Sequence, residues 1–197
     1  MRQPLLLLIA LMVSSCASTS VPSDFRFGPQ SAQGLIVGSI TYDSAIGLYG
    51  VNATSRDGGS SFGARVGYSQ WPPLGPLVDD ALKMKGGTFA VAVVRGQYTL
   101  QRWSIQQGMM VYAADKPIGL VFKAEAGKVT YLGNFHFDTN GDVALSDQAV
   151  RDLPILHSRI PSAGITEPAY AVAAGTRLER IGNGNANRID EPIYAPT

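Results

Sequence analysis

The chain holds one cysteine, Cys16, and a single thiol limits what sulfur chemistry is available. One cysteine forms neither an internal disulfide nor a cysteine-rich zinc site. It follows an unbroken apolar run, Leu5–Val13, which is preceded by the positively charged Arg2. That run is too short to cross a hydrocarbon core, which needs about 20 residues, but it suits the apolar region of a secretory signal. The thiol therefore stands where such a leader ends, directly after the small residues Ser14 and Ser15.

The string V-S-S-C that ends at Cys16 resembles the lipobox of bacterial lipoproteins. In that family a diacylglyceryl group is attached to the cysteine sulfur, and the chain is cut immediately before this residue. The resemblance implies that residues 1–15 are a signal peptide and that Cys16 is the lipid-attachment residue. Ala17 in place of an aspartate resembles the outer-membrane sorting default of Gram-negative lipoproteins. A plain signal peptide with an incidental cysteine and an uncleaved anchor are the alternatives.

Two histidines, His136 and His157, are the only side chains of this type in the chain. A metal site or a catalytic triad needs partners that converge on such a histidine. Neither an H-E-x-x-H nor a G-x-S-x-G motif is present. We therefore expect a protein that is not an enzyme and that needs no cofactor, with an envelope hydrolase as a third functional class.

The string D-T-N-G-D at residues 138–142 places oxygen ligands at alternate positions, as the first half of a calcium loop does. The twelfth position of such a loop would be Ala149, where a bidentate glutamate is needed. An Asn-Gly turn after a strand accounts for the same residues. We therefore predict no metal site here.

Several aromatic side chains could form a binding surface, namely Trp71, Tyr68 and Trp103. The proline-rich string around Trp71 could hold its ring rigidly at low entropic cost. Stacking of a sugar on these rings would make the protein a glycan-binding module. Packing of the same rings into the hydrophobic core is the alternative interpretation.

Composition and charge exclude several classes of protein. The 197 residues suit one domain, and a formal charge of +1 leaves no basic stripe for nucleic acid. Removal of residues 1–15 also removes Arg2, so the mature chain has a formal charge of zero. A neutral body has little attraction to anionic lipids, so acyl chains would have to provide the membrane attachment.

The mature chain divides into three parts by composition. Residues 16–33 are rich in serine and proline, and we predict a lipidated tether there. Residues 34–160 carry short apolar segments separated by glycines, which is typical of a folded domain rich in strands. Residues 161–197 contain scattered prolines and the string G-N-G-N-A-N-R, and we expect a largely irregular extension.

The apolar segments between residues 34 and 137 indicate about seven short strands in an antiparallel β-sandwich. Residues 88–94 and 97–105 are separated by a break at Arg95-Gly96 and predict a hairpin. Residues 118–124 and 128–137 repeat this arrangement across Glu125-Ala126-Gly127. In the last segment one face is predicted to carry four core residues, Val129, Tyr131, Phe135 and Phe137.

Residues 146–158 are the one segment that predicts a helix. Ser146 can cap it, and Val150, Leu153 and Leu156 recur at helical spacing. Because Pro154 lacks an amide hydrogen, we expect this helix in two short pieces.

Three segments, G-L-I-V-G-S-I-T-Y, R-G-Q-Y-T-L-Q-R-W and A-G-K-V-T-Y-L-G-N-F, resemble a family of uncharacterised bacterial lipoproteins. The resemblance covers roughly residues 34–160 and implies a prealbumin-like or carboxypeptidase-regulatory-like β-sandwich. It implies no catalytic residues. In such a fold Gly96 and Gly127 would permit turns, and Tyr98 and Tyr131 would fill the core with a polar tip. We therefore expect a lipid-anchored binding or structural module of the cell envelope with a protein partner there.

Overall fold

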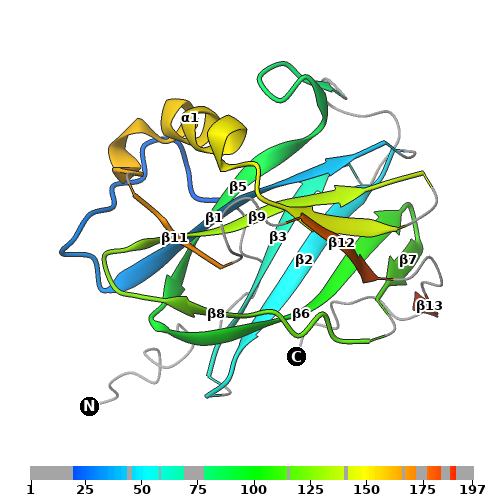
Figure 1. Cartoon of the computed structure of the whole chain (residues 1–197), viewed down its shortest axis with the longest axis horizontal. Helices are drawn as coiled ribbons and strands as arrows, with labels where there is room; N and C mark the ends of the chain where they lie inside the picture. The colour runs from blue at the N-terminus through cyan, green and yellow to red at the C-terminus, as the bar shows by residue number, and fades with distance from the viewer. Residues whose placement is uncertain are drawn as a thin grey trace, which may run out of the picture.

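The computed structural model describes residues 20–43, 46–57, 59–68, 78–114, 116–139, 142–165, 167–171, 177–182 and 187–189. Two β-sheets face each other over this part of the chain, and one helix covers the outer side of the first sheet (Figure 1). The structure therefore confirms an all-β sandwich with a short helix late in the chain. None of the described helices is long and apolar enough to cross a membrane.

The first sheet, sheet A, has seven strands, and its two central strands, β9 and β1, are paired in parallel. Its strands in spatial order are β12 (Arg177–Gly182), β10 (Val143–Ser146), β9 (Val129–Phe137), β1 (Gln33–Tyr42), β5 (Met84–Val94) and β4 (Val78–Asp79), with β11 (Ala169–Tyr170) also paired to β9.

The second sheet, sheet B, has six strands and is antiparallel throughout. Its strands in spatial order are β13 (Asn187–Ile189), β7 (Met110–Ala113), β6 (Gly96–Gln107), β2 (Leu48–Ser55) and β3 (Ser61–Gly67), with β8 (Val121–Ala124) also paired to β6.

Aromatic rings fill the space between the two sheets. Tyr42 of β1 stacks on Tyr49 of β2 with ring centroids 4.1 Å apart, and Phe137 of β9 meets the edges of both Tyr49 and Trp103. These contacts join sheet A to sheet B, because each ring pair takes one ring from sheet A and one from sheet B. Burial of large rings provides most of the hydrophobic stabilisation of such a sandwich.

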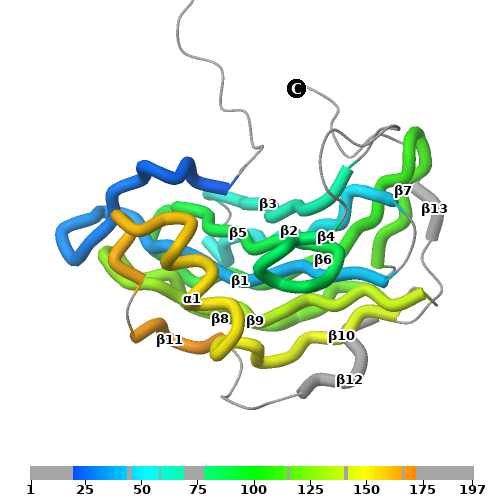
Figure 2. The backbone as a smooth tube through the Cα atoms, turned by 90° about the horizontal axis from the view of Figure 1, so that it is seen from above, coloured from blue at the N-terminus to red at the C-terminus, as the bar shows by residue number. Residues whose placement is uncertain are grey.

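A second apolar cluster lies on the outer face of sheet A. Here Leu35 and Val37 of β1 and Tyr131 of β9 pack beneath helix α1 (Ala149–Arg159) and the 3-10 helix η1 (Pro161–Ala163). Residues 20–32, which we call the N-terminal strap, lie against the same face and bring Phe27 into this cluster. Figure 2 shows the strap running beside α1 before the chain enters β1. Packing therefore begins before Gly34.

The two predicted hairpins are wrong. Strand β5 pairs with β1 in sheet A, whereas β6 pairs with β2 in sheet B, so Arg95 carries the chain from one sheet to the other. The Tyr98 hydroxyl donates a hydrogen bond of 2.8 Å to the Val94 carbonyl and holds this corner. Strand β8 likewise pairs with β6 and not with β9. A turn signal alone does not determine which strand becomes the partner.

Strand β9 does not keep one face towards the core, contrary to the prediction. Val129 and Tyr131 belong to the outer cluster, whereas Phe135 and Phe137 belong to the inner one. The pairing of β9 with β1 is parallel and shifts register opposite residues 37–39, and Gly133 has a φ of 107° there. This bulge adds one residue to β9, so the alternation of side chains reverses after it.

Helix α1 is one unbroken helix, so the prediction of two pieces is wrong. Pro154 lies inside it and removes the bond that the Val150 carbonyl would accept. Both residues lie on the exposed side of α1, where water can bond that carbonyl. Ser146 is not the cap, because the helix begins after Gln148.

The C-terminal extension is more regular than expected. Strands β11 and β12 join sheet A beside β9 and β10, and β13 joins sheet B beside β7. Open strand edges supply hydrogen-bonding groups to any segment that passes beside them, whatever its composition.

Candidate functional site

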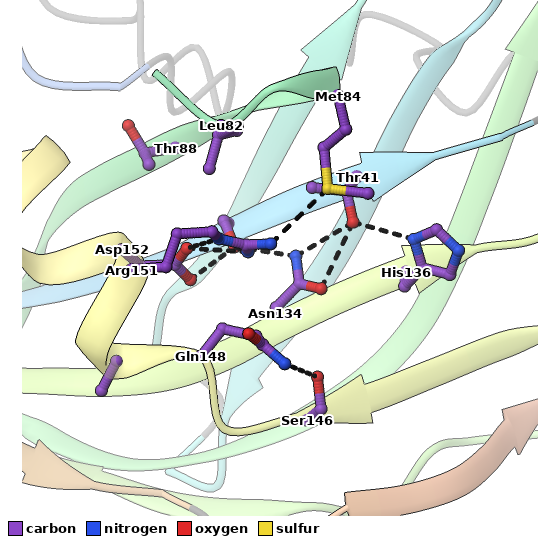
Figure 3. Close-up of polar contacts among 12 residues, drawn as sticks. Thr41, Leu82, Met84, Thr88, Asn134, His136, Ser146, Gln148, Arg151 and Asp152 are labelled. Carbon is purple, nitrogen blue, oxygen red and sulfur yellow. Dashed lines mark hydrogen bonds and ion pairs between the residues drawn. The ribbon is translucent and has the colours of Figure 1, made fainter. Parts of the chain in front are cut away.

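A chain of polar side chains runs along the outer face of sheet A, beneath and beside α1 (Figure 3). We call it the polar chain, and its six members, each bonded to the next, are Asp152, Ser39, Asn134, Thr41, His136 and Asp43. It connects a fully buried carboxylate on α1 to an exposed carboxylate at the end of β1.

The buried end of the polar chain is Asp152, which is 0% exposed. The hydroxyls of Ser39 and Tyr131 donate hydrogen bonds of 2.6 and 2.7 Å to its Oδ2. Arg151 donates a hydrogen bond of 2.8 Å from Nε to Oδ1 and pairs with the same oxygen through Nη2. Both carboxylate oxygens are therefore satisfied, as a buried charge requires.

Tyr131 connects this carboxylate to the first turn of α1. Its hydroxyl accepts a hydrogen bond of 3.2 Å from the Gln148 amide while it donates to Asp152. Burial, and then the neighbouring charge of Asp152, raise the pKa of Tyr131 far above its ordinary value. The phenol therefore keeps its proton and acts as a permanent donor.

Asn134 joins the two hydroxyls of β1. Its Nδ2 donates to the Ser39 Oγ at 2.8 Å and to the Thr41 Oγ1 at 3.2 Å. Asn134 itself is buried in β9, next to the bulge at Gly133. The bulge turns this amide outwards, so that it lies beside the polar positions of β1.

The exposed end of the polar chain has an order that resembles a hydrolase triad. His136 lies 3.1 Å from Asp43 through Nε2 and 2.9 Å from the Thr41 Oγ1 through Nδ1. A carboxylate only accepts, so the His136 Nε2 is the nitrogen that donates to Asp43, and Nδ1 is the nitrogen that faces the hydroxyl. The arrangement therefore holds an acid, an imidazole and a hydroxyl in line.

The hydroxyl of this arrangement cannot reach a substrate. Thr41 and Ser39 are both 0% exposed, and each already bonds to neighbouring side chains. A nucleophile needs open space beside its oxygen and a base that can take its proton. The geometry supports a structural role, in which the polar chain fixes the position of α1 on the sheet.

The other end of α1 is held by an ion pair. The Arg159 guanidinium lies 2.5 Å from the Asp79 Oδ2 and donates a second hydrogen bond to the Thr88 hydroxyl of β5. Burial alone would raise the pKa of Asp79, but the hydrogen bonds from Arg159 and from the Leu82 and Ala81 amides outweigh it. The pKa of Asp79 therefore lies below its ordinary value.

A small hollow of about 210 Å³ lies between β8, β9 and β11. Lys123 and Lys128 stand at this hollow and both contact Glu125, at 2.8 and 2.5 Å. Hydrogen bonds from the two ammonium groups lower the pKa of Glu125 to about 2. Glu125 thus already pairs with both lysines at the surface.

The structure places the sequence-predicted aromatic residues apart. Trp103 is 1% exposed and packs against Phe137, so it does not form part of a binding surface. Tyr68 is half-buried after the end of β3. Trp71 and Cys16 lie outside the described residues, and the glycan-binding alternative therefore rests chiefly on Trp71.

The structure does not bring the two histidines together. His136 joins the polar chain, whereas His157 lies exposed on α1. Asn140 and Gly141 of the loop lie outside the described residues, and the Asp142 amide donates a hydrogen bond of 3.0 Å to the Asp138 Oδ1. The described residues contain no group of three metal-ligating side chains.

Sequence reasoning missed most of the polar chain. A usable signal was present in β1, where Ser39 and Thr41 interrupt an otherwise apolar strand at alternate positions. Alternate positions of a strand share a face, so the hydroxyls of Ser39 and Thr41 must lie on the same side of the sheet. Nothing local indicated that Asp152 would meet them, because it lies 113 residues away from Ser39.

No protein-family model and no curated protein matches the chain. Among solved structures, a leucine-rich repeat protein from Bacteroides thetaiotaomicron is similar to part of it, with 14% sequence identity and a TM-score of 0.29. That similarity covers 56% of this chain and 14% of the other.

Proposed function

We propose that this protein is a lipid-anchored module of the bacterial cell envelope that binds or supports an envelope protein and catalyses no reaction. The observation that carries the proposal is the position of the only thiol, Cys16, behind a short apolar leader and two small residues. An unpaired thiol in an oxidising compartment is otherwise a liability, whereas acylation gives it a purpose.

The geometry of the folded body supports a role without chemistry. The hydroxyls of the polar chain are buried and already bonded, and they lie under a helix that they hold in place. The surface lysines beside the hollow are paired with Glu125. Recognition of a partner by an envelope module requires only a stable surface at the right distance from the membrane.

Acylation is tested on protein purified from its native host. Mass spectrometry of the N-terminal peptide is expected to show a chain that begins at Cys16 and carries fatty acyl groups. The Cys16→Ser variant is expected to leave the membrane fraction, whereas Ser18→Ala, a matched change just beyond the anchor, is expected to remain there. An intact leader or an unmodified sulfur in the native protein would overturn the proposal.

The outer membrane is the proposed location. Ala17 follows the anchor, so the native protein is expected in the outer-membrane fraction of a density gradient, and Ala17→Asp is expected to move it to the inner membrane. An identical distribution of the two proteins would contradict this location. Crosslinking in the native envelope followed by mass spectrometry is expected to recover one protein partner, and its absence would count against the binding role.

A further inference from the structure

We infer that the N-terminal strap holds the sandwich close to the bilayer, with the β5 edge of sheet A facing the lipid. This inference rests on the proposed acylation of Cys16. We call the stretch of chain between Cys16 and its first bond to the folded body the leash. It is much shorter than the expected tether of residues 16–33, because most of that segment is bound to the folded body.

The first attachment of the strap is to the outer edge of β5, at Ala90, beyond the residues that pair with β4. The Val21 amide donates a hydrogen bond of 2.7 Å to the Ala90 carbonyl, and the Ala90 amide donates one of 3.0 Å to the Ser20 hydroxyl. Ala90 pairs with Val37 of β1 on its other side within the register of the sheet. The strap thus begins as a short addition to the sheet, at the edge opposite β10 and β12.

The second attachment is apolar. Phe27 is buried in the outer cluster with Leu35 and Ile165, while Val21 and Phe25 pack against the same cluster. The Phe27 amide also donates a hydrogen bond of 3.3 Å to the Ser162 carbonyl of η1. Burial of this ring removes apolar surface from water and so favours the bound strap.

The third attachment is a close contact of two backbones. The Pro29 carbonyl lies so near Gly127 that any Cβ there would collide with it. Gly127 has a φ of 69°, and its amide donates a hydrogen bond of 2.9 Å to the Gln33 carbonyl. The strap is therefore bound at its start, its middle and its end.

Chain length then limits the distance to the membrane. Four peptide steps separate Cys16 from Ser20, and four residues span at most about 14 Å. A free tether of 17 residues would reach up to about 60 Å and average about 23 Å. A folded domain of this size is roughly 40 Å across. A leash shorter than the domain forces its attachment point to face the bilayer.

Charge does not oppose this orientation. Asp24 and Arg26 are the charged residues of the strap, and they cancel. At the β4 end of this edge, Asp79 and Arg159 neutralise each other. Asp80, Lys83, Lys85 and Arg95, in or beside β4 and β5, add one negative and three positive charges, so an anionic headgroup layer does not repel the β5 edge.

The leash is tested with full-length, acylated protein in vesicles whose lipids carry an energy-transfer acceptor. A donor dye is placed through a clickable amino acid at Val94, an exposed position on β5. Eight Gly-Ser residues are inserted between Ser18 and Thr19 in one variant. The matched control carries the same insertion between Gly108 and Met109, in the exposed turn between β6 and β7.

The insertion before the strap triples the maximum length of a four-residue leash but adds only about half to a 17-residue tether. We therefore expect a large loss of energy transfer in that variant and none in the matched control. Release of the strap by Phe27→Ser is expected to reduce transfer as well. A small loss, equal to that expected for a 17-residue tether, would overturn the inference.

Two further measurements separate this inference from the proposed function. Mass spectrometry of the same protein reports whether Cys16 is acylated, and an unmodified Cys16 would overturn both. Hydrogen exchange reports the strap alone, because slow exchange of the Val21 amide requires its bond to Ala90. Fast exchange of the Val21 amide in acylated protein would overturn the inference of a short leash but would not affect the proposed acylation of Cys16.

Discussion

The two faces of sheet A are buried in different ways. The inner face meets sheet B through aromatic rings, and the rings of Tyr42, Tyr49, Phe137 and Trp103 contact one another in turn. The outer face meets α1 through an apolar cluster and, beside it, the polar chain that ends at Asp152.

This difference shows two ways to specify a packed surface. Apolar contacts are strong but not directional, so they decide that two sheets meet more than where they meet. Hydrogen bonds among buried groups are directional and costly to break, so they decide where a helix lies. Directional hydrogen bonds therefore matter more for the position of a single helix on a sheet face than for the position of a second sheet.

Truncation of Trp103 tests the inner face and should have the largest effect. Trp103→Ala is expected to lower the free energy of unfolding by about 3–5 kcal/mol, because it leaves a large cavity. Urea unfolding followed by circular dichroism measures the change, with Met109→Ala at an exposed turn as the control. Trp103→Phe should cost less, since the buried Nε1 of Trp103 has no hydrogen-bond partner among the described residues. A cost below about 1 kcal/mol for the alanine variant would show that this core can collapse around the gap.

Removal of Asp152 tests the outer face. Asp152→Ala is expected to cost about 3 kcal/mol, because it leaves the Arg151 charge and the Ser39 and Tyr131 hydroxyls without their acceptor. Asp57→Ala, at an exposed turn, is the matched control. Hydrogen exchange should accelerate in α1 while β2 and β6 stay protected. Equal acceleration in both regions would mean that the polar chain supports the whole sandwich and not the helix alone.

A side chain at Gly133 tests the point where β9 passes from one pattern to the other. Its φ of 107° suits glycine, and a Cβ there would lie 2.8 Å from the Leu145 Cδ1. Gly133→Ala is expected to cost about 2 kcal/mol. Gly59→Ala is the control, because a Cβ at Gly59 would meet nothing within 4 Å. Equal thermal unfolding of the two variants would show that the bulge tolerates a side chain.

Asp79→Asn tests the rim of the outer face and should have the smallest effect, about 1 kcal/mol at neutral pH. The pKa of Asp79 is lower in the folded protein than in the unfolded chain. Its contribution is therefore fully present above the unfolded pKa of about 4 and is lost as the pH falls through the lower folded value. The difference in stability between wild type and variant should shrink below pH 4, and a constant difference would exclude an ionic origin.

Several elements could be predicted because their signals are local. Alternating apolar residues in β1 and β5 indicated strands, and the spacing of Leu153 and Leu156 indicated the one helix. The hydroxyls of Tyr98 and Tyr131 also have hydrogen-bond partners, as expected of tyrosines in a core. The candidate site could not be predicted in the same way, because Ser39, Asn134 and Asp152 come from three distant segments.

The amino-acid sequence alone determined that the chain is rich in strands, where its α-helix lies and that it holds a single thiol, since each depends on residue types or on neighbouring residues. Only the tertiary structure decided that β5 and β6 lie in different sheets, that Trp103 is buried and that residues 20–32 bind the folded body. Strand pairing and burial depend on contacts between distant segments, and a local pattern carries no information about its partner. The same pattern of serines and prolines that is typical of a free tether can therefore lie bound along the edge of a sheet.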